Sequence, residues 1–341
     1  MRIEEDTKLD YSDVLIRPKR STLTSRFDVD MDRTYQFVHS KKEWTGIPIM
    51  ASNMDTVGTF EMHGALDKHN VITSLAKHYN TEFAASKTED CEFYNVNTLC
   101  VMGGIADWDM EQTIEIYKKH APAFIGLDVA NGYTISFVDA VKRLRDACPD
   151  ATIVAGNVVT ADMTQELILS GADIVKVGVG PGSVCTTRIK TGIGYPQLSA
   201  VMECADAAHG LNGHIIADGG CNSSGDIVKG FAGGADFVMI GGMLAGHNEC
   251  DGELVNGKMR FYGMSSNTAM DRHKVGKREY RGEEGKTVEV PHKGPVDDTI
   301  IDILSGIRSA CTYVGAQKLK TLSKCSTFVR VNSTHNTVFG G

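Results

Sequence analysis

The sequence lacks the features that mark several large classes of protein. No stretch approaches the roughly 18 apolar residues that a membrane-spanning helix requires. Although the chain has 35 basic and 43 acidic residues, no block of like charge stands out. A formal net charge of −8 without a basic cluster favours neither nucleic acid nor an anionic membrane as a partner. The first six residues are acidic and show no apolar signal-peptide core, so we expect a soluble, cytoplasmic protein.

Signs of disulfide or zinc sites are also missing. The nine cysteines are odd in number and include no CxxC pair, which argues against a disulfide framework or a structural zinc site. The 11 histidines include no HExxH motif. Free thiols are therefore expected, and a nucleophilic role for one of them is chemically available.

No Pro-, Gly- or Ser-rich linker divides the 341 residues, so we expect one catalytic domain over residues 1–341. Short, almost continuous apolar runs alternate with helical patterns, as in a parallel sheet covered on both faces. Eight such units predict a (β/α)8 TIM barrel, with a doubly wound open sheet as the structural rival. The expected strands are Ile47–Ala51, Val71–Leu75, Thr98–Met102, Phe124–Val129, Thr152–Ala155, Ile174–Val177, His214–Ala217 and Phe237–Ile240.

After the eighth strand the pattern changes. Residues 248–293 are polar and contain many glycines. Within them, Glu253–Tyr262 predicts a hairpin that turns at Asn256-Gly257. An insertion of this kind at the end of a barrel strand predicts a mobile flap over the site rather than a core element. The segment Asp297–Arg308 predicts a last helix that closes the barrel.

The run from Gly180 to Arg188, GPGSVCTTR, is the most distinctive segment. It places Cys185 in a loop of small residues, followed by two hydroxyls and a guanidinium. A thiol near a positive charge ionises more easily, and the thiolate is the attacking species. The run therefore predicts a reactive-cysteine loop. A buried structural cysteine in a tight turn is the alternative.

Glycine pairs follow the seventh and eighth predicted strands. Gly219-Gly220 come after Asp218, and Gly241-Gly242 follow the eighth strand. These two loops form the usual phosphate-binding corner of a (β/α)8 barrel, where exposed backbone amides meet phosphate oxygens. Asp218 could accept hydrogen bonds from ribose hydroxyls. Together the pairs favour a nucleotide site, although each pair alone could simply make a tight turn.

At these residues the chain resembles the family of IMP dehydrogenases and GMP reductases. The chain resembles the reductases more closely than the dehydrogenases, over essentially its whole length. A regulatory insert between the second and third barrel strands, usual in the dehydrogenases, is missing here. The matching segments include Gly180–Arg188, Asp218–Gly220, Gly241–Gly246, Tyr262–Ser266, Asn53–Phe60, Asp128–Tyr133, Ala155–Thr160, Tyr280-Arg281 and Glu284–Val288.

The resemblance implies NADPH-dependent reductive deamination of GMP to IMP, with release of ammonia through a covalent Cys185 thioimidate. It implies catalytic roles for Cys185, Thr187 and Glu284, and a homotetramer. It implies a monovalent-cation site, with K⁺ as the expected ion, at Gly180, Gly182, Cys185 and the Arg188 region. The implied GMP contacts are Asp218, Gly219, Gly220, Gly241, Gly242, Gly263, Met264 and Ser265. The implied NADPH contacts are Ser25, Arg26, Lys77, Asp128, Val129, Ala130, Val179, Gly180, Tyr280, Arg281, Glu284, Ser309, Ala310, Cys311 and Thr312.

Two loops depart from the family pattern. Ala76-Lys77-His78-Tyr79 stands where His-Lys-His-Tyr is expected, and Val101–Ile105 replaces a turn rich in Ser, Thr and Gly. An IMP dehydrogenase-like enzyme and a catalytically silent guanine-nucleotide sensor therefore remain the alternative functions.

Overall fold

The computed structural model describes residues 3–86, 94–273 and 282–332. Eight parallel strands pair in chain order, and the last returns to the first through Val238↔Ile49, Met239↔Met50 and Ile240↔Ala51. The sheet is therefore a closed barrel, which confirms the predicted (β/α)8 fold over the open-sheet rival. Its strands are β3 (Glu43–Ala51), β4 (Val71–Leu75), β5 (Leu99–Gly103), β6 (Phe124–Asp128), β7 (Ile153–Val158), β8 (Ile174–Val177), β9 (His214–Asp218) and β10 (Phe237–Ile240).

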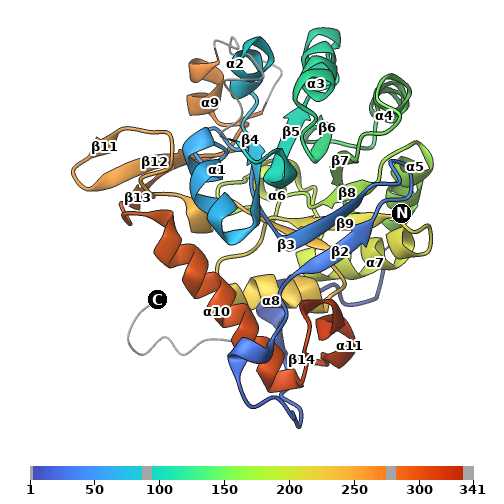
Figure 1. Ribbon diagram of the computed structural model, residues 1–341, viewed down its shortest axis with the longest axis vertical. Coiled ribbons are helices and arrows are strands. Elements are labelled where there is room, and N and C mark those ends of the chain that lie inside the picture. The colour runs from blue at the N-terminus through green and yellow to red at the C-terminus, as the bar shows by residue number, and fades with distance from the viewer. Residues whose placement is uncertain (1–2, 87–93, 274–281, 333–341) are drawn as a thin grey trace.

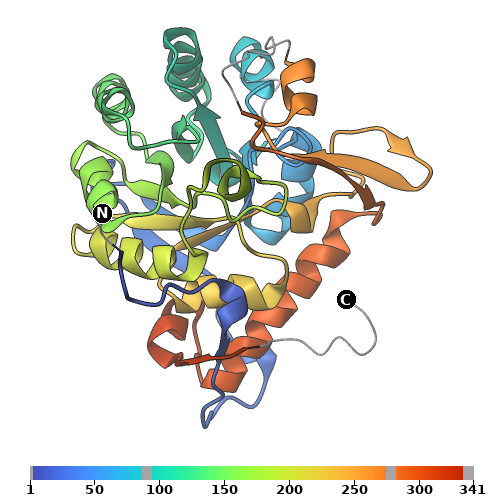
Figure 2. The same ribbon diagram turned by 180° about the vertical axis from the view of Figure 1, so that it is seen from behind.

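Helices surround this barrel on its outside (Figures 1 and 2). The side chains that they turn inward form the main hydrophobic core with the outward-facing residues of the strands. The expected last helix is real and longer than predicted, because α10 continues to Val314. The surrounding helices are α1 (Phe60–Leu66), α2 (Tyr79–Ala85), α3 (Asp107–His120), α4 (Ile135–Ala147), α5 (Ala161–Leu169), α7 (Gln197–His209), α8 (Ser224–Ala232) and α10 (Val296–Val314).

Aromatic side chains close the amino-terminal end of the barrel. Strand β2 (Arg33–Gln36) pairs antiparallel with the first half of β3, so that Tyr35 lies opposite Trp44. Tyr35 also packs on Phe237, with ring centroids 4.6 Å apart. These rings, together with Phe37 and Phe124, form one buried cluster inside the barrel. A ligand therefore has to enter from the opposite end.

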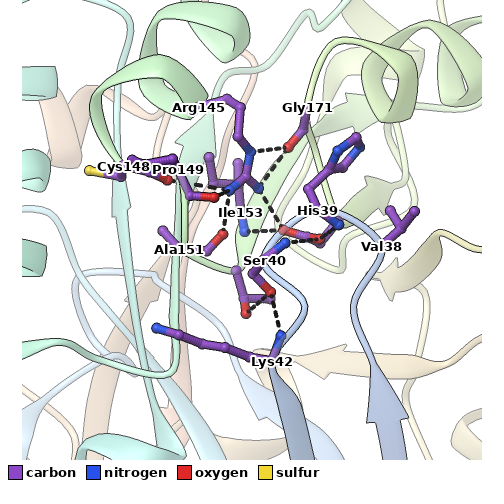
Figure 3. A network of polar contacts seen from close by, with 12 residues as sticks. Val38, His39, Ser40, Lys42, Arg145, Cys148, Pro149, Ala151, Ile153 and Gly171 are labelled. Atoms are coloured by element: carbon purple, nitrogen blue, oxygen red, sulfur yellow. Dashed lines mark hydrogen bonds and ion pairs between the residues drawn. The ribbon is translucent and has the colours of Figure 1, made fainter.

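A polar network next to this aromatic cluster fixes the turn between β2 and β3 (Figure 3). The fully buried carboxylate of Asp173 accepts hydrogen bonds from the amides of His39 and Ser40. Arg145 on α4 donates to the same carboxylate at 2.7 Å and to the carbonyl of Gly171. The buried charge is paired and its oxygens are satisfied, which is the condition for tolerating it in a core.

The described parts of residues 248–293 form more than a flap. The predicted hairpin is present, with β11 (Leu254–Val255) and β12 (Lys258–Tyr262) joined by Asn256 and Gly257 at φ of 52° and 73°. Strand β13 (Thr287–Pro291) completes a three-stranded sheet, and α9 (Asn267–Arg272) lies between β12 and β13 in the chain. The expectation that no core element lies here is wrong for β12, because it buries Met259, Phe261 and Tyr262.

The remaining elements are short. Strands β1 (Val14–Ile16) and β14 (Phe328–Arg330) form an antiparallel pair, and α11 (Leu322–Cys325) precedes β14. Helix α6 (Thr187–Thr191) follows β8. Among the described residues, no helix has the length and apolar character needed to cross a membrane.

Candidate active site

A pocket of about 580 Å³ opens at the carboxyl ends of the barrel strands. In this fold, those ends carry the catalytic groups. Most of the predicted site residues line it, and they come from at least five different strand ends. The predicted residues in its wall are Lys77, Asp128, Val129, Ala130, Val179, Gly180, Gly182, Cys185, Thr187, Asp218, Gly219, Gly220, Gly241, Gly242, Gly263, Met264, Ser265 and Glu284.

The cysteine loop starts where β8 ends. Gly178 and Gly180 have φ of 154° and 86°, and in this region a residue with a Cβ is strained. The loop then tightens, as the amide of Cys185 donates to the carbonyl of Gly182 at 3.0 Å. Cys185 is partly exposed in the pocket wall. This placement favours the reactive-cysteine interpretation over the buried structural cysteine.

Three side chains form a hydrogen-bonded chain in the pocket. The Sγ of Cys185 lies 3.2 Å from Oγ1 of Thr187, and that hydroxyl donates to Oε2 of Glu284 at 2.7 Å. A thiol, a hydroxyl and a carboxylate in this order provide a path along which a proton can move. A hydroxyl can accept from one side while it donates to the other.

Backbone pairing brings Glu284 to this position. The amide of Thr186 donates to the carbonyl of Glu284, and the amide of Lys286 donates to that of Val184, both at 2.9 Å. This short antiparallel bridge matches Cys185 with Gly285. A Cβ on Gly285 would lie 2.9 Å from the amide nitrogen of Ser266, so only glycine fits this approach without a shift.

The neighbouring carboxylate has a different role. Oε1 of Glu283 accepts a hydrogen bond from the amide of Asn267, at the first residue of α9. An acidic side chain at a helix start stabilises the unpaired amides there. The two glutamates are adjacent in the sequence, but the structure separates a helix-stabilising carboxylate, Glu283, from one in the pocket, Glu284.

The glycine pairs leave their backbone open to a ligand. Gly219 and Gly220 have φ of 88° and 85°. Among the described residues, their amides have no acceptor. Ser52 and Asn157 also line the pocket, and in the described part of the chain the hydroxyl of Ser52 and Oδ1 of Asn157 have no hydrogen-bond partner. Unsatisfied polar groups are costly when buried, and a polar ligand would satisfy them.

A buried cation lies between two of the acidic side chains in the pocket wall, Asp128 and Asp218. Nζ of Lys176 lies 3.0 Å from Oδ1 of Asp128 and 3.2 Å from Oδ2 of Asp218. Burial alone would raise the pKa of Asp128, but the Lys176 ammonium and the hydrogen bond from Asn53 together hold that pKa below its usual value. Both carboxylates therefore face the pocket as part of one charged group.

Sequence reasoning missed Lys176. Asn53 and Asn157 appeared only inside longer motifs, although their amides bond to Asp128 and Asp218. One signal was available: Lys176 is the single charged residue in the buried run Ile174–Val177. A lysine in such a strand has to be paired, because an isolated buried charge is strongly unfavourable.

Arg188 belongs to the cysteine loop without pointing its charge at the thiol. Its Nη1 pairs with Asp10 at 3.1 Å, and Nη2 donates to the carbonyl of Tyr195. Its aliphatic stem packs so closely on Gly180 and Gly194 that a Cβ on either glycine would clash with it. The expectation that this guanidinium promotes ionisation of Cys185 requires the two groups to lie close together, but the guanidinium pairs with other groups. Arg188 instead supports the loop.

Some predicted cofactor residues lie away from the pocket. Ser25 and Arg26 lie at a short 3-10 turn that packs on α10, and Ser309–Thr312 lie in the last part of that helix. In Figure 1 the end of α10 lies below α8 and beside α11. The side chain of Cys311 is fully buried there. Tyr280 and Arg281 lie outside the described residues.

A model of the IMP dehydrogenase / GMP reductase domain matches residues 8–337. The chain belongs to the IMP dehydrogenase / GMP reductase family. Among this family's members, GMP reductase from Shewanella pealeana is 57% identical over 349 residues, which cover 100% of this chain and 99% of that protein. Human GMP reductase 1 is 57% identical over 346 residues, which cover 99% of each chain.

A solved structure of the same family agrees in fold. A variant of GMP reductase from Trypanosoma brucei, in complex with guanosine 5′-monophosphate, superposes with a TM-score of 0.84. The match covers 96% of each chain at 24% identity. The agreement extends to the whole barrel.

Proposed function

We propose that this chain is a GMP reductase, which converts GMP, NADPH and a proton into IMP, ammonia and NADP⁺. The observation that carries the proposal is the hydrogen-bonded chain from Cys185 through Thr187 to Glu284. Support also comes from the full-length likeness to curated GMP reductases.

The residues fit this chemistry step by step. Carbon 2 of guanine is electron-poor between two ring nitrogens, so the sulfur of Cys185 can bond to it while its proton passes through Thr187 to Glu284. The exocyclic amine is a poor leaving group until it is protonated. A proton returned along the same path would break the C2–N bond and release ammonia, which leaves the purine held as a thioimidate.

The second half of the reaction is a reduction. NADPH, when bound, supplies the hydride that C2 requires. The C2–S bond then breaks, so that IMP leaves and the Cys185 thiolate takes up the proton that the overall reaction consumes. Covalent catalysis in this way divides one difficult substitution into two easier steps.

The pocket offers separate surfaces for the two nucleotides. We propose that GMP lies against Asp218–Gly220, Gly241-Gly242 and Gly263–Ser265, where the free amides of Gly219 and Gly220 suit a phosphate or hydroxyl oxygen. NADPH would lie against Lys77, Asp128–Ala130 and Val179-Gly180, which also line the pocket. Lys77 pairs with Asp109 at 2.9 Å, so a cofactor phosphate would share that charge.

The cysteine loop also suits a monovalent cation. The carbonyls of Gly180 and Cys185 accept no hydrogen bond from any described group, and the carbonyl of Gly182 accepts one. Carbonyl oxygens are suitable ligands for a hard cation. We propose that K⁺ would be held by these three carbonyls and would fix the shape of the loop, with Arg188 supporting it from behind.

We further propose a homotetramer in which another copy supplies Ser25, Arg26 and Ser309–Thr312 to the NADPH site. These residues do not line the pocket of their own chain, and the neighbouring side chains of Phe27 and Tyr313 are 95% and 64% exposed. Sedimentation will give the oligomeric state. Arg26→Ala should raise the KM for NADPH and leave GMP affinity unchanged, whereas an unchanged KM would exclude Arg26 from the site.

One assay tests the function directly. Absorbance at 340 nm should fall with GMP and NADPH, ammonia should appear in equal amount, and IMP or XMP should not replace GMP. NADH formation from IMP and NAD⁺ would instead identify a dehydrogenase. Tight GMP binding without turnover and without an adduct at Cys185 would identify a nucleotide sensor.

A further inference from the structure

In the described part of the chain, Lys176 is the one basic residue whose side chain is buried inside the barrel, at the bottom of the pocket. It is 3% exposed, and it lies on β8 two residues after Ile174, whose side chain is in the interior cluster. Side chains two apart on a strand share a face, so Lys176 continues the same inward row. Gly156 on β7 makes room for it, since a Cβ there would lie 2.6 Å from the Cβ of Lys176.

The ammonium of Lys176 joins two arms of the site. Oδ1 of Asp128 pairs with the ammonium of Lys176, and Oδ2 accepts a hydrogen bond from the side-chain amide of Asn53 at 2.7 Å. Oδ2 of Asp218 pairs with the ammonium of Lys176 and also accepts a hydrogen bond from the side-chain amide of Asn157 at 2.8 Å. Oδ1 of Asp218 has no partner among the described residues and is therefore the oxygen free to meet a ligand.

We propose that Lys176 is a positioning residue that couples the two nucleotide subsites, because it holds the Asp218 carboxylate for GMP and the Asp128 carboxylate for NADPH on one buried cation. The inference rests on the proposed function, since that function assigns the two carboxylates to different ligands. Neither carboxylate can turn or take up a proton without disturbing the other.

The charges at this site determine what the loss of Lys176 would do. With Lys176 present, one cation lies between two anions. Without it, two buried carboxylates would face each other across the vacated space, and like charges at such distances raise one pKa strongly. One of them would keep a proton at low pH and lose it as the pH rises, so the site would be disturbed more at higher pH.

Other groups nearby do not reproduce this behaviour. Burial raises the pKa values of Tyr11, Cys100 and Cys221, so these groups stay neutral between pH 6 and 8. Lys77 keeps its own partner, Asp109. Cys185 and Glu284 are present in both the wild type and the variants. Their effect therefore cancels in the ratio of the variant's ligand dissociation constant to that of the wild type.

The test compares Lys176→Met with wild type by direct binding. We expect the dissociation constants of GMP and of NADPH each to rise about tenfold at pH 7, the usual scale for losing a charge-assisted contact. The variant-to-wild-type ratio should also grow from pH 6 to pH 8. A change for one ligand only, or a ratio that does not depend on pH, would overturn the coupling.

A second variant removes the charge imbalance. Lys176→Met with Asp218→Asn leaves a single carboxylate, so the pH dependence should disappear while GMP affinity stays no lower than in Asp218→Asn alone. If Lys176→Met does not fold, the double variant still should. Failure of both to fold would show that Lys176 serves the fold alone. Wild-type protein that binds but does not reduce GMP would refute the proposed function, not the coupling.

Discussion

Oγ1 of Thr187 lies 2.7 Å from Oε2 of Glu284, although 97 positions separate the two residues in the chain. Thr187 begins α6 after the cysteine loop, whereas Glu284 precedes β13. Their contact completes the path from the Cys185 thiol to a carboxylate. The first predictions test this path one member at a time.

Cys185→Ala should abolish turnover and leave GMP binding nearly unchanged, because the sulfur forms the covalent bond while other groups hold the nucleotide. Calorimetry and the NADPH assay together will show the separation. Cys325→Ala on α11 is the matched control and should behave as wild type. A Cys185→Ala enzyme with substantial activity would refute the covalent route.

Glu284→Gln should lower kcat by about 10²–10⁴-fold, the usual contribution of a general acid or base. The KM for GMP should change much less, because the group acts on the leaving amine. Glu283→Gln is the adjacent control, since its Oε1 accepts from Asn267 outside the pocket wall. An effect confined to KM would make Glu284 a binding group only.

Thr187→Val removes the hydroxyl and keeps the volume, so ammonia release should slow about as much as in Glu284→Gln. Thr187→Ser should restore most of the rate. The two residues act as a unit, so Thr187→Val combined with Glu284→Gln should be no slower than either alone. Rapid-quench measurement of ammonia will decide this, and fully additive losses would contradict the relay.

Gly285→Ala should push the Glu284 segment away from the cysteine loop. The added Cβ would lie 2.9 Å from the amide nitrogen of Ser266, closer than real contacts allow. A displacement of about 1 Å near reacting groups can cost roughly 10²-fold in rate. Gly282→Ala is the control, because a Cβ there meets no atom of the described residues within 4 Å. Equal kcat values for the two variants would contradict this close packing.

Stability should depend on pH through His209. Its hydrogen bond to Asp236, at 2.8 Å, raises the pKa of this histidine against the opposing effect of burial. A raised folded-state pKa stabilises the protein fully below about pH 6.5, and this contribution disappears as the pH rises through the folded value.

The Tm difference between wild type and His209→Gln should therefore be larger at pH 6 than at pH 9. Thermal unfolding at both pH values measures the contrast, and parallel curves for wild type and His209→Gln would refute it.

The sequence by itself determined the barrel and most of the pocket wall. Buried parallel strands produce apolar runs that are easy to recognise, and β4, β8 and β10 coincide with their predicted bounds. The Asn256-Gly257 turn was predictable because few residues accept positive φ. In a (β/α)8 barrel, loops after strands meet at one end, so naming those loops also locates the site.

Only the tertiary structure decided which polar groups touch. The bridge between Cys185 and Gly285 separates Glu284 from Glu283, and no local pattern encodes that choice. The partners of Lys176 come from β6 and β9, so its role depends on barrel closure. Spacing along a chain fixes local geometry and one-sided burial, whereas hydrogen bonds between distant segments exist only after the core has brought their backbones together.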